Sequence, residues 1–148
     1  MPSHNPFFLI GTGTAGADIA VTSAADIYTF TIPCKCRPLR SGFTVGTTVS
    51  ASDAPVIAFD RRPTAGSDTS RGDGDVGEVT LTTSSAQGQV YYEDNDGGTN
   101  WTTTLLNEGD QVVVQVTTNS DSTGGGVPWL MLEYIPEVAG NNTVMNET

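Results

Sequence analysis

The chain has 148 residues, and its 6 lysines and arginines against 17 aspartates and glutamates give a formal net charge of −11 at pH 7. That length suits one domain. Such an excess of acids excludes nucleic-acid binding by phosphate neutralisation, which needs a basic face. No run approaches the roughly 20 apolar residues of a membrane-spanning helix, so we expect neither a nucleic acid nor a membrane as partner.

The charges are unevenly distributed along the chain. All six basic residues lie between positions 35 and 71, whereas residues 73–148 contain twelve acids and no base. One interpretation is an acidic surface that keeps the protein soluble. The other is a polar molecule whose mildly basic patch docks onto an acidic partner or onto an acidic face of its own neighbour.

Residues 1–25 are predicted to form an N-terminal arm. The apolar patch Phe7-Phe8-Leu9-Ile10 is followed by small residues such as Gly11, Gly13 and Gly16. The start of the chain lacks a basic n-region and a long apolar stretch, so we expect no secretory signal. The patch either folds back as an edge strand or reaches a neighbouring subunit.

Alternating apolar and polar residues predict short strands through residues 26–136, separated by turns rich in Gly, Pro, Asn, Asp and Ser. These strands are expected at residues 27–32, 43–49, 57–59, 79–81, 90–92, 112–116 and 129–135, with 101–105 a possible eighth. Long polar loops are expected at 61–77 and 118–127, and residues 137–148 read as a polar C-terminal tail. The pattern favours an all-β antiparallel β-sandwich of jelly-roll type, with a closed barrel as the alternative.

The last predicted strand is apolar on both faces. Alternation places Leu130, Leu132 and Tyr134 on one face and Trp129 and Met131 on the other. Such a strand is either central between two layers or presents its second face to a partner.

No arrangement of residues indicates catalysis or a metal site. His4, the only histidine, lies in the terminal segment, where a general base would lack a rigid position. The acids near 73–78 and 93–96 lack the ligand spacing of a calcium loop. Cys34 and Cys36 are too few for a closed zinc site and too close for an unstrained disulfide. We therefore expect two reduced thiols, with pairing between subunits as the alternative, and no catalytic residue, metal or cofactor.

Several segments resemble small structural proteins of tailed bacteriophages. The resemblance lies in 27–33 (IYTFTIP), 56–63 (VIAFDRRP), 72–77 (GDGDVG), 109–114 (GDQVVV) and 134–142 (YIPEVAGNN), and covers about residues 26–142. Proteins of this kind are capsid decoration, or cement, proteins. The resemblance implies a jelly-roll or related module on the outer capsid surface that bridges neighbouring major capsid subunits, often as a trimer. It also implies synthesis in the bacterial cytoplasm, which suits unpaired thiols.

The resemblance carries no docking motif, so the interface residues follow from physical reasoning. Phe7, Phe8, Leu9 and Ile10 are expected to be buried against the shell or a sister subunit. Arg61 and Arg62, predicted to be an exposed basic pair, would meet shell carboxylates. Trp129 and Met131 would face a subunit interface.

Two other classes of function stay open. A virion adhesin or tail-associated carbohydrate-binding module could stack sugars on Tyr91, Tyr92 and Trp101, although these aromatics could equally be core residues. A hydrolase built on a sandwich fold is disfavoured by the terminal histidine and the dispersed acids.

Overall fold

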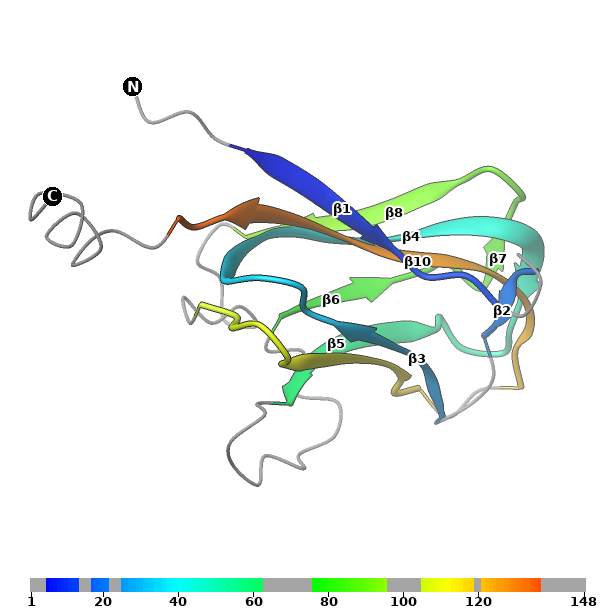
Figure 1. The fold of residues 1–148 in the computed structure, drawn as a ribbon. Helices are drawn as coiled ribbons and strands as arrows, with labels where there is room; N and C mark the ends of the chain where they lie inside the picture. The colour runs from blue at the N-terminus through cyan, green and yellow to red at the C-terminus, as the bar shows by residue number, and fades with distance from the viewer. Residues whose placement is uncertain are drawn as a thin grey trace, which may run out of the picture.

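The computed structural model describes residues 5–13, 17–21, 25–62, 76–95, 105–118 and 121–136. These residues form two antiparallel sheets packed face to face, and the part described contains no helix (Figure 1). The chain is therefore an all-β sandwich, as the alternating pattern predicts. The strands are β1 (Pro6–Ile10), β2 (Ile19–Ala20), β3 (Asp26–Thr31), β4 (Cys36–Ser50), β5 (Val56–Arg62), β6 (Gly77–Thr80), β7 (Ser84–Ser85), β8 (Val90–Asp94), β9 (Gln111–Val116) and β10 (Thr123–Tyr134).

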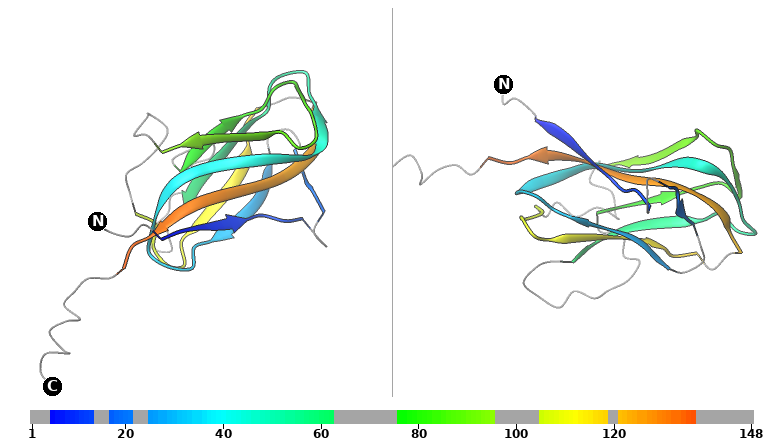
Figure 2. Two further views of the ribbon diagram at one scale, coloured as in Figure 1. Left: turned by 90° about the horizontal axis from the view of Figure 1, so that it is seen from above. Right: turned by 45° about the vertical axis from the view of Figure 1, so that its right-hand side comes forward.

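The chain passes back and forth between the two sheets. Sheet A has the order β1-β10-β4, with β7 and β8 both paired to the far side of β4 and β2 paired to β10 beside β1. Sheet B has the order β3-β9-β5-β6. Along the chain, β1 and β2 lie in sheet A, β3 in B, β4 in A, β5 and β6 in B, β7 and β8 in A, β9 in B and β10 in A (Figure 2).

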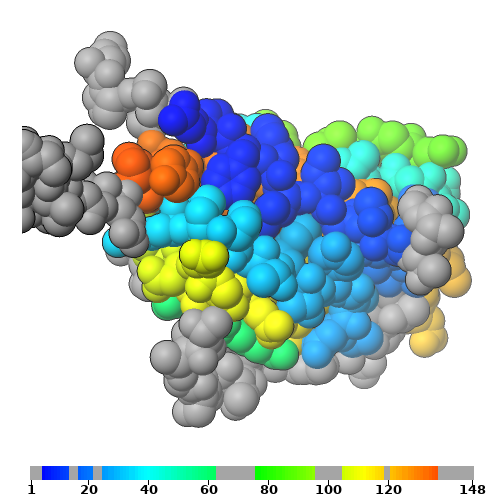
Figure 3. All heavy atoms as spheres, viewed as in Figure 1, coloured from blue at the N-terminus to red at the C-terminus, as the bar shows by residue number. Residues whose placement is uncertain are grey.

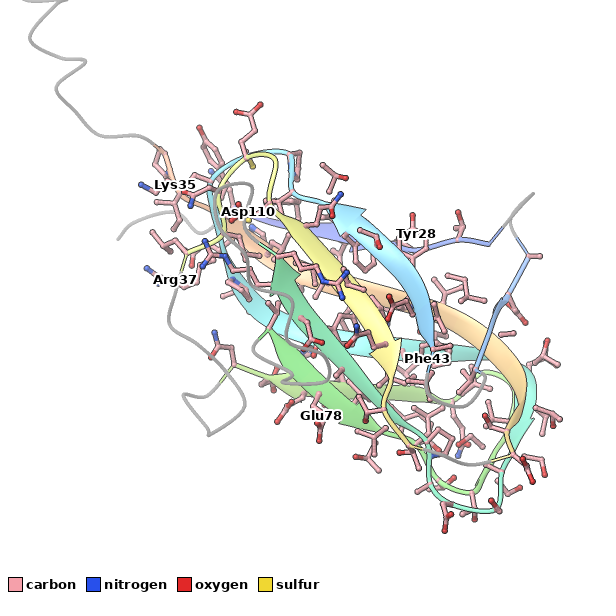
Figure 4. All side chains as sticks on the ribbon, turned by 90° about the horizontal axis from the view of Figure 1, so that it is seen from below. Tyr28, Lys35, Arg37, Phe43, Glu78 and Asp110 are labelled. Atoms are coloured by element: carbon pink, nitrogen blue, oxygen red, sulfur yellow. The ribbon has the colours of Figure 1, made fainter. Side chains whose placement is uncertain are left out.

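The core lies between the sheets, where every second residue points inward. Phe43 of β4 and Leu130 of β10 meet Ile57 and Phe59 of β5 there, all fully buried (Figure 4 labels Phe43). The prediction that Leu130 and Leu132 share one face of the last strand is confirmed, because both belong to this core.

Part of the predicted N-terminal arm belongs to sheet A. β1 pairs along its whole length with β10, from Pro6 opposite Glu133 to Ile10 opposite Trp129. Of the two arrangements open to the apolar patch, the structure shows the one in which it folds back as an edge strand. Because Pro6 and Glu133 are opposite each other, both described ends of the chain leave the sandwich at the same end (Figure 1). The predicted C-terminal tail, 137–148, lies outside the described residues.

Two strands begin six or seven residues before the sequence pattern predicts. β4 begins at Cys36 rather than at residue 43, and β10 begins at Thr123, inside the predicted loop 118–127. The two strands pair with each other from Thr123 opposite Ser50 to Tyr134 opposite Cys36, with three register shifts. This long central pair positions both edge strands of sheet A.

Candidate functional site

The outer face of sheet A, which points away from the core, exposes large apolar side chains. Phe8, Ile10, Val90 and Tyr92 are 54%, 61%, 51% and 54% exposed. Their chain neighbours Phe7, Leu9 and Tyr91 pack against the core, so alternation directs these four side chains outward. Monomeric proteins rarely leave a contiguous apolar patch uncovered unless it binds a partner.

The register of the strands joins these side chains into one surface. Ile10 is opposite Trp129, Trp129 is opposite Gly42, and Gly42 is opposite Tyr92, which makes one row across four strands. Neighbouring rows add further apolar groups from β10 and β8. We call this surface the apolar face; it consists of Phe8, Ile10, Val90, Tyr92, Val127, Trp129 and Met131.

The indole of Trp129 is held against the sheet by its neighbours. It occupies the space above Gly42, where a Cβ atom would lie 2.1 Å from Cζ2 of the indole. The indole Nε1–H donates a hydrogen bond to Thr44 Oγ1 at 3.2 Å. The Phe8 ring lies beside it, with ring centroids 6.0 Å apart and planes inclined by 59°. The central aromatic group of the apolar face is therefore preorganised.

Of the predicted interface residues, four meet on the apolar face: Phe8, Ile10, Trp129 and Met131. Phe7 and Leu9 do not, because they point inward and are partly buried against the chain's own core. The expectation that the whole patch is available to a partner ignored the two-residue alternation of a strand.

Arg61 and Arg62 lie elsewhere, at the end of β5 in sheet B, and the expectation that they form an exposed pair is wrong. The Arg61 side chain is only 19% exposed, and its Nε and Nη2 donate to Asp110 Oδ2 at 3.3 and 3.2 Å. Arg62 is half-buried, and its Nε has no hydrogen-bond partner among the described residues. Arg61 is therefore part of an internal ion pair.

Charges at the border of the apolar face are paired. The Arg40 guanidinium lies 4.1 Å from the centroid of the Tyr92 ring and binds Asp94 on β8. The hydrogen bond to Asp94 raises the pKa of Arg40. Arg37 forms a second pair with Glu133, at 3.8 Å. These pairs leave the surface between them close to electrically neutral.

The outer face of sheet B has a different character. It carries Asp26, Asp60 and Glu78, but Asp60 is only 2% exposed, and Val113 and Gln115 of β9, on the same side, are buried as well. Burial, followed by the charges of Glu93 and Asp60, raises the pKa of Glu78. Figure 4 views the molecule from this side and labels Glu78, with Asp110, Lys35 and Arg37 near one end of the sandwich. The centre of the outer side of sheet B is therefore buried and is not an open acidic surface.

The aromatic residues considered for sugar stacking are divided by the fold. Tyr92 belongs to the apolar face, whereas Tyr91 turns inward and its hydroxyl donates to Ser85 Oγ at 3.0 Å. Trp101 lies outside the described residues, as does His4. The alternation of Val90 and Tyr92 is visible in the sequence, but it does not connect them with Trp129, which lies on another strand.

Within the described ranges, no three His, Cys, Asp or Glu side chains are grouped so that they could hold a metal ion. The acids Glu93 and Asp94, considered for calcium, have other partners: Glu93 Oε2 accepts the Glu78 N–H at 2.8 Å, and Asp94 binds Arg40. Cys34 and Cys36 are both free thiols, with Cys36 buried.

The buried thiol gives a prediction for stability at high pH. Burial, with smaller contributions from Cys34 and Asp110, raises the pKa of Cys36 from 9.0 to about 12. Between these values unfolding releases a proton, so the free energy of unfolding should fall as pH rises, by up to about 1.4 kcal/mol per pH unit. Urea unfolding across this range should show a steeper fall for the native chain than for Cys36→Ala. Equal slopes would contradict the assignment.

The described residues contain no helix long and apolar enough to cross a membrane. Comparisons with protein-family models, with curated proteins and with solved structures find no match to this chain.

Proposed function

We propose that the chain is a structural virion protein that decorates and stabilises the icosahedral capsid of a tailed bacteriophage, where it bridges neighbouring major capsid protein subunits. It would be made in the cytoplasm of the bacterial host and lie on the outer capsid surface. The observation that carries the proposal is the apolar face, a preorganised surface with paired charges at its border.

The fold supports the same proposal. A jelly roll consists of eight strands in two sheets, wound as two Greek keys, and occurs widely in capsid proteins. Counting β1 with β2 and β7 with β8 as one position each leaves eight strand positions. In chain order these positions occupy sheets A, B, A, B, B, A, B and A, which supports the jelly-roll form of the sandwich.

The apolar face suggests an orientation on the shell. The apolar face of sheet A would lie against the capsid, where burial of each large apolar side chain contributes roughly 1.5–3 kcal/mol. Sheet B would then point outward. The net charge of −11 would keep assembled particles apart by charge repulsion.

A first test measures copy number in virions purified from the phage that encodes the chain. Quantitative mass spectrometry should give a ratio to the major capsid protein within a few-fold of one. A handful of copies per particle would instead indicate a tail or fibre component, and absence from virions would remove the proposal.

The role of the apolar face can be tested on capsids that lack the chain. Ile10→Lys should weaken binding of the purified chain by at least about tenfold, because it places a charge in the buried contact. Thr29→Lys introduces the same charge on the exposed outer side of sheet B and serves as the matched control. Equal binding of both variants would show that the apolar face does not dock.

A carbohydrate-binding virion module is the second candidate, favoured by the aromatic side chains Trp129, Phe8 and Tyr92 on one face. Saturable glycan binding that is lost in Tyr92→Ala, together with a low copy number, would favour this candidate over the first.

A further inference from the structure

β1 leaves one edge of sheet A unpaired. β10 lies on one side of β1, and no described strand pairs with the other side (Figure 2). In an antiparallel ladder each residue directs its N–H and C=O to the same side, and the side alternates along the strand. The Gly11 N–H donates to Pro128 O at 2.8 Å and Asn5 O accepts the Tyr134 N–H at 3.2 Å, so odd-numbered residues face β10. Pro6, Phe8 and Ile10 therefore direct their backbone groups outward.

Apart from Pro6 at its first position, this edge lacks the usual protection against pairing with another chain. Natural edge strands carry charges, inserted prolines or bulges. Of the other edge strands, β3, β6 and β8, which have four or more residues, each contain an acid, whereas residues 5–13 contain no charged residue. Figure 3 shows the atoms of β1 at the surface along one side of the molecule. Phe8 and Ile10, on this strand, are also among the most exposed apolar residues.

We infer that β1 pairs with β1 of a second copy of this chain, antiparallel and about a two-fold axis. Each copy carries a net charge of −11, so two copies can approach closely only where charge is absent. The β1 edge and the adjoining residues 123–132 of β10 are uncharged. A two-fold contact uses the same surface on both copies, which an unpaired antiparallel edge satisfies by itself.

The length of β1 sets the register. Pairing over all five residues places Phe8 opposite Phe8 of the second copy and Pro6 opposite Ile10. The two Phe8 residues then exchange two N–H to C=O hydrogen bonds, and each Ile10 N–H donates to the Pro6 C=O of the other copy. Pro6 has no N–H to donate, so the ladder ends there. Four hydrogen bonds join the copies.

The same register places the two Phe8 side chains side by side on the outer face. Directly opposed aromatic residues stabilise an antiparallel pair. Each Phe8 also contacts Trp129 of its own copy, so the two apolar faces become one continuous surface. The inference is independent of the proposed function, and the two-fold contact differs from the trimer that the resemblance implies.

Proline substitution separates the backbone contact from the side-chain contact. Phe8→Pro removes an outward N–H and leaves the hydrogen bonds to β10 intact, since proline is tolerated on an edge strand. Phe8→Ala removes the same side chain and keeps the N–H. In sedimentation experiments over a range of concentrations, the native chain should reach twice its mass of 15.5 kDa. Phe8→Pro should stay monomeric, and Phe8→Ala should still dimerise at higher concentration.

Ile10→Lys and Val90→Lys form a second matched pair, since both residues are about equally exposed but Val90 lies on β8, across the sheet. Only Ile10→Lys should abolish the dimer. A native chain that is monomeric or trimeric, or equal behaviour of Phe8→Pro and Phe8→Ala, would overturn the inference.

Cross-linking tests the register even if the proline variant fails to fold. The Cys34→Ser background leaves only Cys36, which is buried and cannot link two copies. In this background, Phe8→Cys places two thiols opposite each other, with Cα atoms about 5.5 Å apart. Ile10→Cys places them four residues apart along the ladder, roughly 14 Å. Mild oxidation should link Phe8→Cys and not Ile10→Cys. The reverse result, or no linkage in either, would overturn the register, whereas capsid binding without dimers would leave the proposed function standing.

Discussion

Asp110→Ala is expected to lower the free energy of unfolding by about 3–5 kcal/mol, because removing one partner of a buried ion pair leaves the other charge uncompensated. Asp110 is 1% exposed, and its Oδ2 accepts hydrogen bonds from Arg61 and from the Asn107 N–H at 2.8 Å. Asp110 therefore makes a hydrogen bond within the turn that leads into β9 and an ion pair with Arg61 of β5. Urea unfolding of the native chain and of Asp110→Ala measures the difference in free energy of unfolding.

A double-mutant cycle identifies the cause of this loss. Arg61→Met with Asp110→Ala removes both charges, so the double variant should be more stable than Asp110→Ala alone. If the two changes in the free energy of unfolding instead add, the destabilisation comes from the lost hydrogen bond in the turn and not from the unpaired charge of Arg61.

Gly42→Ala should disrupt the centre of the apolar face and lower the free energy of unfolding by about 1–3 kcal/mol. The added methyl group would lie 2.1 Å from Cζ2 of Trp129, so the indole must move. Movement breaks its hydrogen bond to Thr44 and its contact with Phe8. In a Trp101→Phe background, Trp129 is the only tryptophan, and its fluorescence and near-ultraviolet circular dichroism report the change.

Ser41→Ala is the matched control on the same strand. Ser41 points to the inner side, and its buried hydroxyl has no hydrogen-bond partner among the described residues. Removing an unpaired buried hydroxyl should leave stability equal or higher. An unchanged tryptophan signal in Gly42→Ala would show that the indole does not depend on the absence of a side chain there.

Alternation predicted the strands where each residue has a side chain that marks its face. Phe30 and Ile32 are buried as the 27–32 pattern requires, and Trp129 and Leu130 lie on opposite faces. The pattern gives no signal where that marker is absent. Residues 124–126 are three glycines within β10, and a Cβ atom on Gly126 would lie 2.1 Å from the Thr44 carbonyl oxygen.

The start of β4 was missed for a related reason. The register shifts between the pairs that involve Arg40 and Pro38, so the alternation breaks at Leu39. A pattern of period two cannot be followed through such an irregularity. The strand therefore seemed to begin only at Phe43, where alternation is regular again.

The candidate site was only partly predictable. Phe8, Ile10, Trp129 and Met131 could be selected as apolar residues without a core partner, but their contact depends on pairing between strands more than 100 residues apart. Arg61 seemed exposed because Asp110, its partner, lies 49 residues away. Sequence alone gives the faces of single strands, and the fold decides which faces meet.

The pairing of Pro6 with Glu133 brings the beginning and the end of the described chain next to each other, with the Asn5 carbonyl accepting a hydrogen bond from Tyr134 N–H. Peptides joined at residue 5 or at residue 136 would therefore leave from the same end of the sandwich. A short linker between residues 136 and 5 would close the chain into a ring, so new termini could be opened in the exposed turn at residues 86–89. The fold is thus suited to circular permutation.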